Sequence, residues 1–151
     1  MIRTNAAKAG IHAGRKVYGL LLPFPCASIV EIMGHLGFDF VMVDAEHGPF
    51  SPESAEEMFR AADSVGLTPL VRVPDHEFST ILRFLDRGAA GIQAPHTNTR
   101  AQAEHVVQAV KYSPLGRRGL GSNRACTFGA AMSRSEYAER AREFLAKARG
   151  S

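Results

Sequence analysis

The sequence repeats one pattern four times: a short apolar run, then a segment whose apolar residues recur every three or four positions. A spacing of three and four is that of an amphipathic helix, and a short run of continuous apolar residues is typical of a strand covered on both faces. The four runs occupy residues 17–22, 38–44, 69–73 and 90–94. Because strands separated by helices pair in parallel, the pattern predicts an α/β fold. Two architectures fit it, a small doubly wound sheet and part of a (β/α)₈ barrel.

The helical segments have recognisable boundaries. Their apolar stripes lie over residues 29–36, 55–65, 78–85 and 103–110. Ser28 is the expected N-cap of the first helix, and Ser51 with Pro52 is the expected start of the second. Gly66 and Gly88 follow the second and third stripes and are expected to end those helices.

The pattern changes after the fourth helix. Residues 113–122 form a glycine-rich loop, and a terminal helix is expected over about residues 133–148, where Ser133 and Glu136 have capping-box spacing. We expect one domain over residues 1–151, with its core over about residues 16–112. The 151 residues are fewer than the roughly 250 of a complete eight-unit barrel.

Charge and composition exclude several classes of protein. The net charge is only +3, and the basic residues near the C-terminus alternate with glutamates, which indicates a solvated helix face rather than a nucleic-acid surface. No apolar run approaches the roughly 20 residues of a membrane span, and residues 1–15 lack the apolar core of a signal peptide. Cys26 and Cys126 have no CxxC partner and are expected to be reduced thiols. We therefore expect a cytoplasmic protein without nucleic-acid or membrane partners.

Ionisable residues gather after the second predicted strand. Asp44, Glu46 and His47 follow it within four positions. The carboxyl ends of parallel strands form the functional end of such folds, and an imidazole held by carboxylates can act as a general base. The alternative is that these side chains only cap the second helix and order its loop. A metal site is disfavoured, because adjacent residues rarely converge on one ion.

Other polar residues leave both structural and functional interpretations open. Arg72, within the third strand, needs an anion, which could be a substrate or an internal ion pair. Asp86 near the end of the third helix is most simply a solvated side chain. Gln93 and His96 follow the fourth strand and could line a pocket, as could Asn98 unless it caps the next helix.

Several separated motifs resemble one family. Residues 37–49, GFDFVMVDAEHGP, resemble the signature of the HpcH/HpaI aldolases, which are metal-dependent pyruvate aldolases. The likeness continues through residues 69–73, 85–89 and 112–119 and covers the chain up to about Gly129. It implies the first four strand–helix units of a (β/α)₈ TIM barrel, followed by a C-terminal helix, in a protein that is usually a hexamer.

The resemblance also implies roles for individual residues. His47 matches the catalytic base, and Asp86 matches the acid that orients this histidine. Arg72 matches the arginine that contacts pyruvate and steadies its enolate, and Ser122 falls in a turn near the substrate carboxylate. Asp44 and Glu46 match acidic residues around the metal and its water. The implied activity is that of an aldehyde-lyase (EC 4.1.2-type), which cleaves a 4-hydroxy-2-oxo acid reversibly to pyruvate and an aldehyde.

The resemblance implies a divalent cation, Mg²⁺, Mn²⁺ or Co²⁺. In the family its direct ligands follow strands five and six, so no direct metal ligand is expected in this chain. A complementing C-terminal half, or a second copy, is the expected partner. One alternative is a non-catalytic half-barrel that self-associates to cover its open strand edges. Another is a nucleotide-binding domain, which is disfavoured because residues 23–28 contain no GxGxxG.

Overall fold

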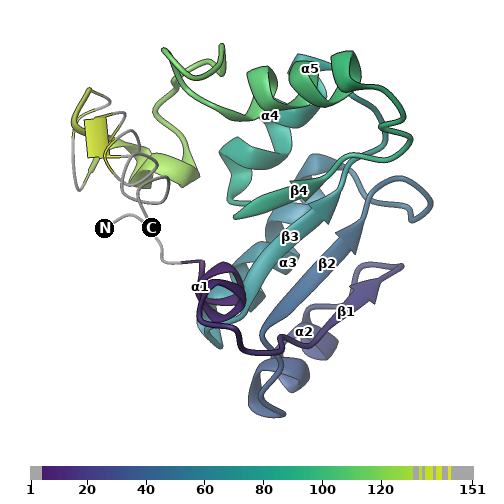
Figure 1. Cartoon of the computed structure of the whole chain (residues 1–151). Coiled ribbons are helices and arrows are strands. Elements are labelled where there is room, and N and C mark those ends of the chain that lie inside the picture. The colour runs from purple at the N-terminus through teal and green to yellow at the C-terminus, as the bar shows by residue number, and fades with distance from the viewer. Residues whose placement is uncertain (1–4, 131–132, 134, 138, 141–142, 144–151) are drawn as a thin grey trace.

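Four parallel strands form the sheet of this protein. The computed structural model describes residues 5–130, 133, 135–137, 139–140 and 143. The strands are β1 (Gly19–Leu22), β2 (Phe40–Asp44), β3 (Thr68–Arg72) and β4 (Gly91–Gln93), and they pair in the order β1–β2–β3–β4. A doubly wound sheet would reverse its strand order at a switch point, whereas this order is sequential, as in a barrel (Figure 1). The predicted parallel α/β fold is confirmed.

A helix follows each strand. These helices are α2 (Ala27–His35), α3 (Pro52–Ser64), α4 (Phe78–Arg87) and α5 (Arg100–Val110). Ser51 caps α3 as predicted, in a reciprocal capping box, and α4 ends at Gly88, whose φ of 118° suits a residue without a Cβ. The prediction that Ser28 caps the first helix is wrong. The extended residue there is Cys26, so α2 begins one residue before Ser28.

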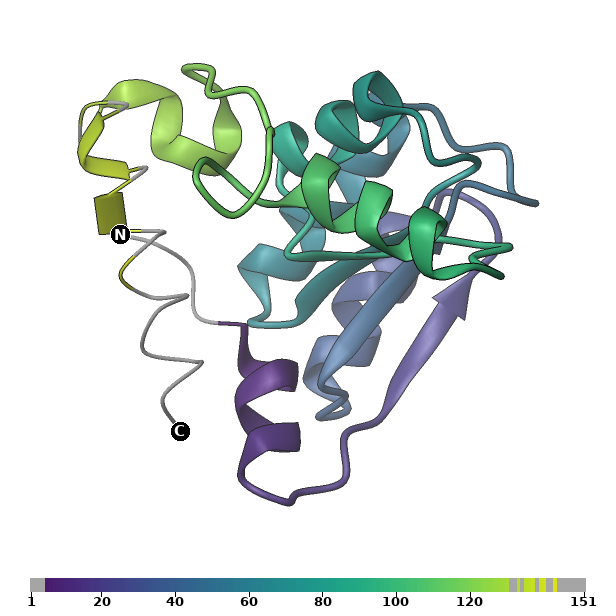
Figure 2. The same ribbon diagram turned by 45° about the horizontal axis from the view of Figure 1, so that its top comes forward.

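The outer face of the sheet carries the hydrophobic core. Consecutive helices pack side by side along this face, from α2 to α5 (Figure 2). Valines of the two central strands and large side chains of α3 and α4 are almost completely buried between sheet and helices. These residues are Val41, Val43, Val71, Phe59, Ile81 and Phe84.

Side chains on the other face of the sheet form two rows. Strand pairing places Leu21, Met42 and Leu70 in one register row, and Leu21 is 44% exposed although it is apolar. Two residues further along, at the carboxyl end of the strands, Asp44 and Arg72 occupy the next row. The apolar row is the inner layer of a barrel that these four strands leave open. The polar row lies at the carboxyl end of the strands, the end at which parallel α/β folds carry their functional sites.

Two short helices were not predicted. Helix α1 (Ala6–His12) lies at the amino end of the sheet, where the Ala7 amide donates to Thr68 Oγ1 at 3.1 Å. A 3₁₀ segment, η1 (Arg124–Gly129), follows the glycine-rich loop.

The predicted terminal helix falls partly outside the described residues. Residues 135–137, 139–140 and 143 are helical, and the Glu136 amide donates to Ser133 Oγ, as the predicted cap requires. No helix within the described ranges is long and apolar enough to cross a membrane.

Candidate active site

The turn after β2 is organised around the Asp44 carboxylate. Asp44 is 3% exposed, and its Oδ1 accepts the backbone N–H groups of Glu46 and His47, each at 3.2 Å. The turn closes tightly at Gly48, because a Cβ there would collide with the carbonyl oxygens of Asp44 and Pro23. The buried acid therefore fixes the backbone from which Glu46 and His47 project.

Arg72 of β3 holds the same carboxylate from the neighbouring strand. Its Nε and Nη2 donate to Asp44 Oδ1 and Oδ2 at 2.9 and 2.6 Å. The two residues are register partners, so strand pairing alone brings them together. The hydrogen bonds from Arg72 lower the pKa of Asp44 to about 2, against an opposing contribution from burial. Conversely, the Asp44 carboxylate raises the pKa of Arg72, and both groups are charged at neutral pH.

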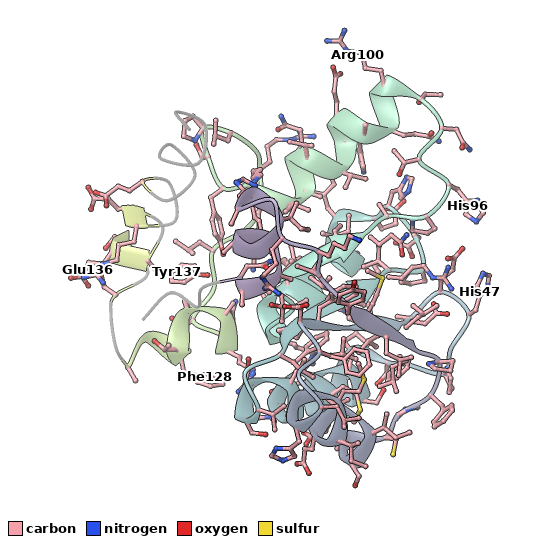
Figure 3. All side chains as sticks on the ribbon, turned by 60° about the horizontal axis from the view of Figure 1, so that its bottom comes forward. His47, His96, Arg100, Phe128, Glu136 and Tyr137 are labelled. Carbon is pink, nitrogen blue, oxygen red and sulfur yellow. The ribbon has the colours of Figure 1, made fainter. Side chains whose placement is uncertain are left out.

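Glu46 extends this ion pair toward two imidazoles. Its Oε2 lies 3.2 Å from Arg72 Nε, and its Oε1 lies 3.0 Å from His96 Nε2 and 3.7 Å from His47 Nε2. The Glu46 side chain is 11% exposed, whereas both imidazoles reach solvent. Figure 3 shows His47 and His96 projecting at the same end of the molecule. The carboxylate is thus within hydrogen-bond distance of His96 and within ion-pair distance of His47.

His96 joins the cluster from the loop after β4. Its φ of 52° lies in the left-handed region, which residues with a side chain rarely adopt. Neighbouring contacts hold this loop, because His76 Nε2 lies 2.5 Å from the Pro95 carbonyl oxygen and 3.3 Å from Thr97 Oγ1. The sequence placed His96 at the correct end of the sheet but assigned it no partner. Its unusual backbone and its contact with Glu46, 50 positions away, appear only in three dimensions.

The remaining expected site residues lie elsewhere. Asp86 is near the end of α4, which runs against the strand direction and brings it to the amino end of the sheet. There its Oδ1 accepts a hydrogen bond from Arg118 Nη2 at 2.9 Å. Gly121, and with it the turn that contains Ser122, lies beside Asp86. The structure therefore brings together Asp44, Glu46, His47 and Arg72 as expected, whereas Asp86 pairs with Arg118 instead of His47.

The cluster can bind an anion and exchange a proton. A guanidinium that uses Nε and Nη2 on one carboxylate keeps its Nη1 hydrogens on the far side. Arg72 is 22% exposed at the side chain, so an anionic oxygen of a bound molecule can reach this free edge. The imidazole of His47 projects from the turn after β2 and is 70% exposed at the side chain, so a bound molecule can reach it as well.

A divalent cation fits the described residues poorly. No group of three or more His, Cys, Asp or Glu side chains within residues 5–130 and the described positions beyond them is arranged to hold a metal. Both carboxylate oxygens of Asp44 already accept hydrogen bonds, from Arg72 and from backbone amides. This part of the chain therefore supplies no complete ligand set for a divalent cation.

Comparisons with known proteins converge on one family. Residues 17–145 match the family model described as HpcH/HpaI aldolase/citrate lyase. The hydroxypyruvate/pyruvate aldolase of Sagittula stellata is 36% identical over 140 residues, which are 92% of this chain and 54% of that protein. The protein of the same name from Agrobacterium fabrum is 39% identical over 118 residues, 78% of this chain and 44% of that protein.

Solved structures agree with the sequence relatives. The crystal structure of an HpcH/HpaI aldolase/citrate lyase family protein from Burkholderia cenocepacia superposes with a TM-score of 0.82 at 32% identity. The match covers 91% of this chain and 56% of that one. The chain thus spans about half the length of the relatives it matches.

Proposed function

Because this chain belongs to the HpcH/HpaI aldolase/citrate lyase family, we propose that it carries the proton-transfer and carboxylate-binding part of a pyruvate-type aldolase. The proposed reaction is the reversible cleavage of a 4-hydroxy-2-oxo acid to pyruvate and an aldehyde. The observation that carries the proposal is the arginine of β3, fixed side-on by Asp44 next to an exposed histidine. That arrangement provides a fixed cation at the end of β3 and a base in the turn after β2.

The proposed steps need few groups. His47 accepts the proton of the C4 hydroxyl, the C4 oxygen becomes the aldehyde oxygen, and the C3–C4 bond breaks. The electron pair of that bond becomes the enolate of pyruvate. The free edge of Arg72 stabilises the negative charge on the carboxylate and enolate oxygens. Protonation of C3, with the proton returned from His47, gives pyruvate.

Glu46 is the proposed positioning residue of this reaction. It lies between Arg72 and the two imidazoles and has little exposure of its own. The family resemblance implies a divalent cation near the 2-oxo group, for which other parts of a longer protein or a partner chain would have to supply ligands. Ser122 and Asp86 lie too near the amino end of the sheet to join this cluster within one chain.

The deciding experiment is a pyruvate-release assay with a 4-hydroxy-2-oxo acid and Mg²⁺, Mn²⁺ or Co²⁺. The chain is assayed alone and mixed with a polypeptide that covers the C-terminal half of a full-length relative. Release of pyruvate in the mixture, lost on chelation and on substitution of His47, supports the proposal. The absence of pyruvate under all of these conditions overturns it.

A second candidate is a non-catalytic half-barrel closed by self-association. The specific observation is the uncovered inner row, where Leu21 is 44% exposed at the free edge strand β1. Two copies related by a twofold axis along the barrel would pair β4 of each copy with β1 of the other, with every strand parallel. Such a dimer would bury both edges and both inner faces.

A further inference from the structure

A cavity of about 620 Å³ lies at the opposite end of the sheet from His47 and Arg72. Its walls come from α1, the C-terminal ends of α3, α4 and α5, the segment entering β4 and the chain around η1. Figure 3 places Phe128 and Tyr137, two residues of this wall, at the far end of the molecule from His47 and His96. The cavity is therefore separate from the candidate active site.

Cationic side chains dominate the lining. Among the described residues, Lys8, Lys111, Arg118 and Arg124 line it, and Asp63 is the one carboxylate in that lining. Asp86 pairs with Arg118, so the described lining and this partner together carry four positive groups and two negative ones. The electrostatic potential within the cavity consequently favours an anion.

The two arginines are built into the wall. Arg118 is 9% exposed at the side chain; its guanidinium stacks on the Tyr112 ring at 4.8 Å and donates from Nη2 to Asp86. Arg124 is 17% exposed and donates from Nη2 to Asp63. In each, Nε is buried and has no hydrogen-bond partner in the described part of the chain.

Buried guanidinium N–H groups without acceptors are costly, and these two belong to side chains that line one cavity. Small adjustments of either side chain would let an oxyanion accept from them, because guanidinium groups match carboxylate and phosphate oxygens in geometry.

Apolar groups complete the lining. Leu85 and Val110 lie in the wall, together with the Phe128 ring, which is 60% exposed. Inorganic phosphate would fill little of a space this large, whereas a carbon skeleton could cover the apolar wall. We propose that this cavity binds an organic oxyanion, a small molecule that carries at least two carboxylate or phosphate groups on a short carbon skeleton. The proposal is independent of the aldolase assignment.

The test is titration of the chain at constant ionic strength with three probes: 2-phosphoglycolate, malonate and inorganic phosphate. Binding is followed by calorimetry and by the NMR shifts of the Ala89, Ala90 and Gly91 amides, which line the cavity. The expected result is saturable binding of 2-phosphoglycolate or malonate, tighter than that of phosphate, with shifts centred on these amides.

Variants connect the binding to the charges. Lys8→Gln and Arg124→Gln are each expected to weaken binding about fivefold to tenfold, the effect of one charge-assisted hydrogen bond. The matched control is Arg100→Gln, since Arg100 is 92% exposed on α5 and does not line the cavity. Among the described residues Lys8 forms no ion pair with Asp63 or Asp86, so its variant remains informative if Arg124→Gln unfolds.

Three results would overturn the proposal. The first is the absence of saturable binding of both organic probes. The second is equal weakening by Arg100→Gln, which would mean general charge attraction. The third is binding of inorganic phosphate as tight as that of the organic probes, which would contradict the role of the apolar wall.

Discussion

The guanidinium of Arg72 grips the carboxylate of Asp44 through two hydrogen bonds, although the residues are 28 positions apart in the sequence. Both sit at the carboxyl end of a strand, in register across β2 and β3. Asp44 therefore holds two parts of the site in place. It fixes the guanidinium of Arg72, and it orders the turn from which His47 projects. Five predictions follow from the cluster and from the open inner face.

Removing the Asp44 charge should destabilise the fold. Asp44→Asn leaves Arg72 without its bidentate partner and weakens the acceptor of two turn amides. We expect the melting temperature to fall by about 4–8 °C, measured by circular dichroism. The control Glu57→Gln changes an acid that is 68% exposed, and this variant should change the melting temperature by about 1 °C or less. Equal shifts in both variants would contradict a structural role for the pair.

The same pair predicts acid sensitivity. The pKa of Asp44 is about 2 in the folded chain, below its ordinary value of 3.8. A lowered folded pKa contributes stability that is complete above about pH 5 and is lost as the pH falls through 3.8 toward 2. Urea unfolding between pH 5 and pH 2.5 should therefore show the difference between wild type and Asp44→Asn shrinking with decreasing pH. A difference that stays constant over this interval would show that the carboxylate charge is not its source.

Activity, assayed in the mixture of the two halves, should depend on His47 and Arg72. We expect His47→Asn to lower kcat about 100-fold or more, because a general base is lost. Arg72→Lys should cost a similar factor, since lysine lacks the planar edge that holds Asp44 and a substrate oxygen together. Matched controls are His35→Asn and Arg60→Lys, both on helices of the outer face. Full activity in either site variant would remove that residue from the mechanism.

The NMR signals of the His47 and His96 rings should change when Glu46 is substituted and stay unchanged when Asp86 is substituted. Glu46→Gln removes the charge shared by His47 and His96 and is expected to move the ¹H–¹³C ring signals of both. Asp86→Asn should leave them in place and instead move signals around Arg118 and Tyr112. A His47 shift in Asp86→Asn would restore the orienting role that the family resemblance implies, for instance through a second copy.

Self-association should depend on the inner row. If two half-barrels close on each other, light scattering after size exclusion gives roughly twice the 16.3 kDa of one chain. Leu21→Glu places a charge on the buried inner layer and should return the mass to that of one chain. Leu36→Glu, at a site 71% exposed at the end of α2, should leave the dimer intact. A wild-type chain that is monomeric at all concentrations excludes this closure.

Much of the framework was accessible from local patterns. Hydrophobic periodicity predicted four strands and four helices in the correct order, and Ser51, Gly88 and the Ser133–Glu136 spacing marked helix boundaries correctly within the described residues. The Ser28 cap was wrong because a single cap residue carries little information when an extended neighbour, Cys26, can begin the helix. Helix α1 is short and is held by a distant contact, from Ala7 to Thr68, which no local pattern reveals.

Sequence alone determined the alternation of strands and helices and the concentration of Asp44, Glu46 and His47 at one strand end, because these depend on neighbouring residues. Which side chains form ion pairs and hydrogen bonds with one another depends on the tertiary structure. The strand register places Arg72 opposite Asp44. The direction of α4 places Asp86 at the other end of the sheet, where it pairs with Arg118. The loop after β4 brought His96 to Glu46. An ion pair depends on where two chain segments meet, and the packing of the sheet and its helices sets that meeting place.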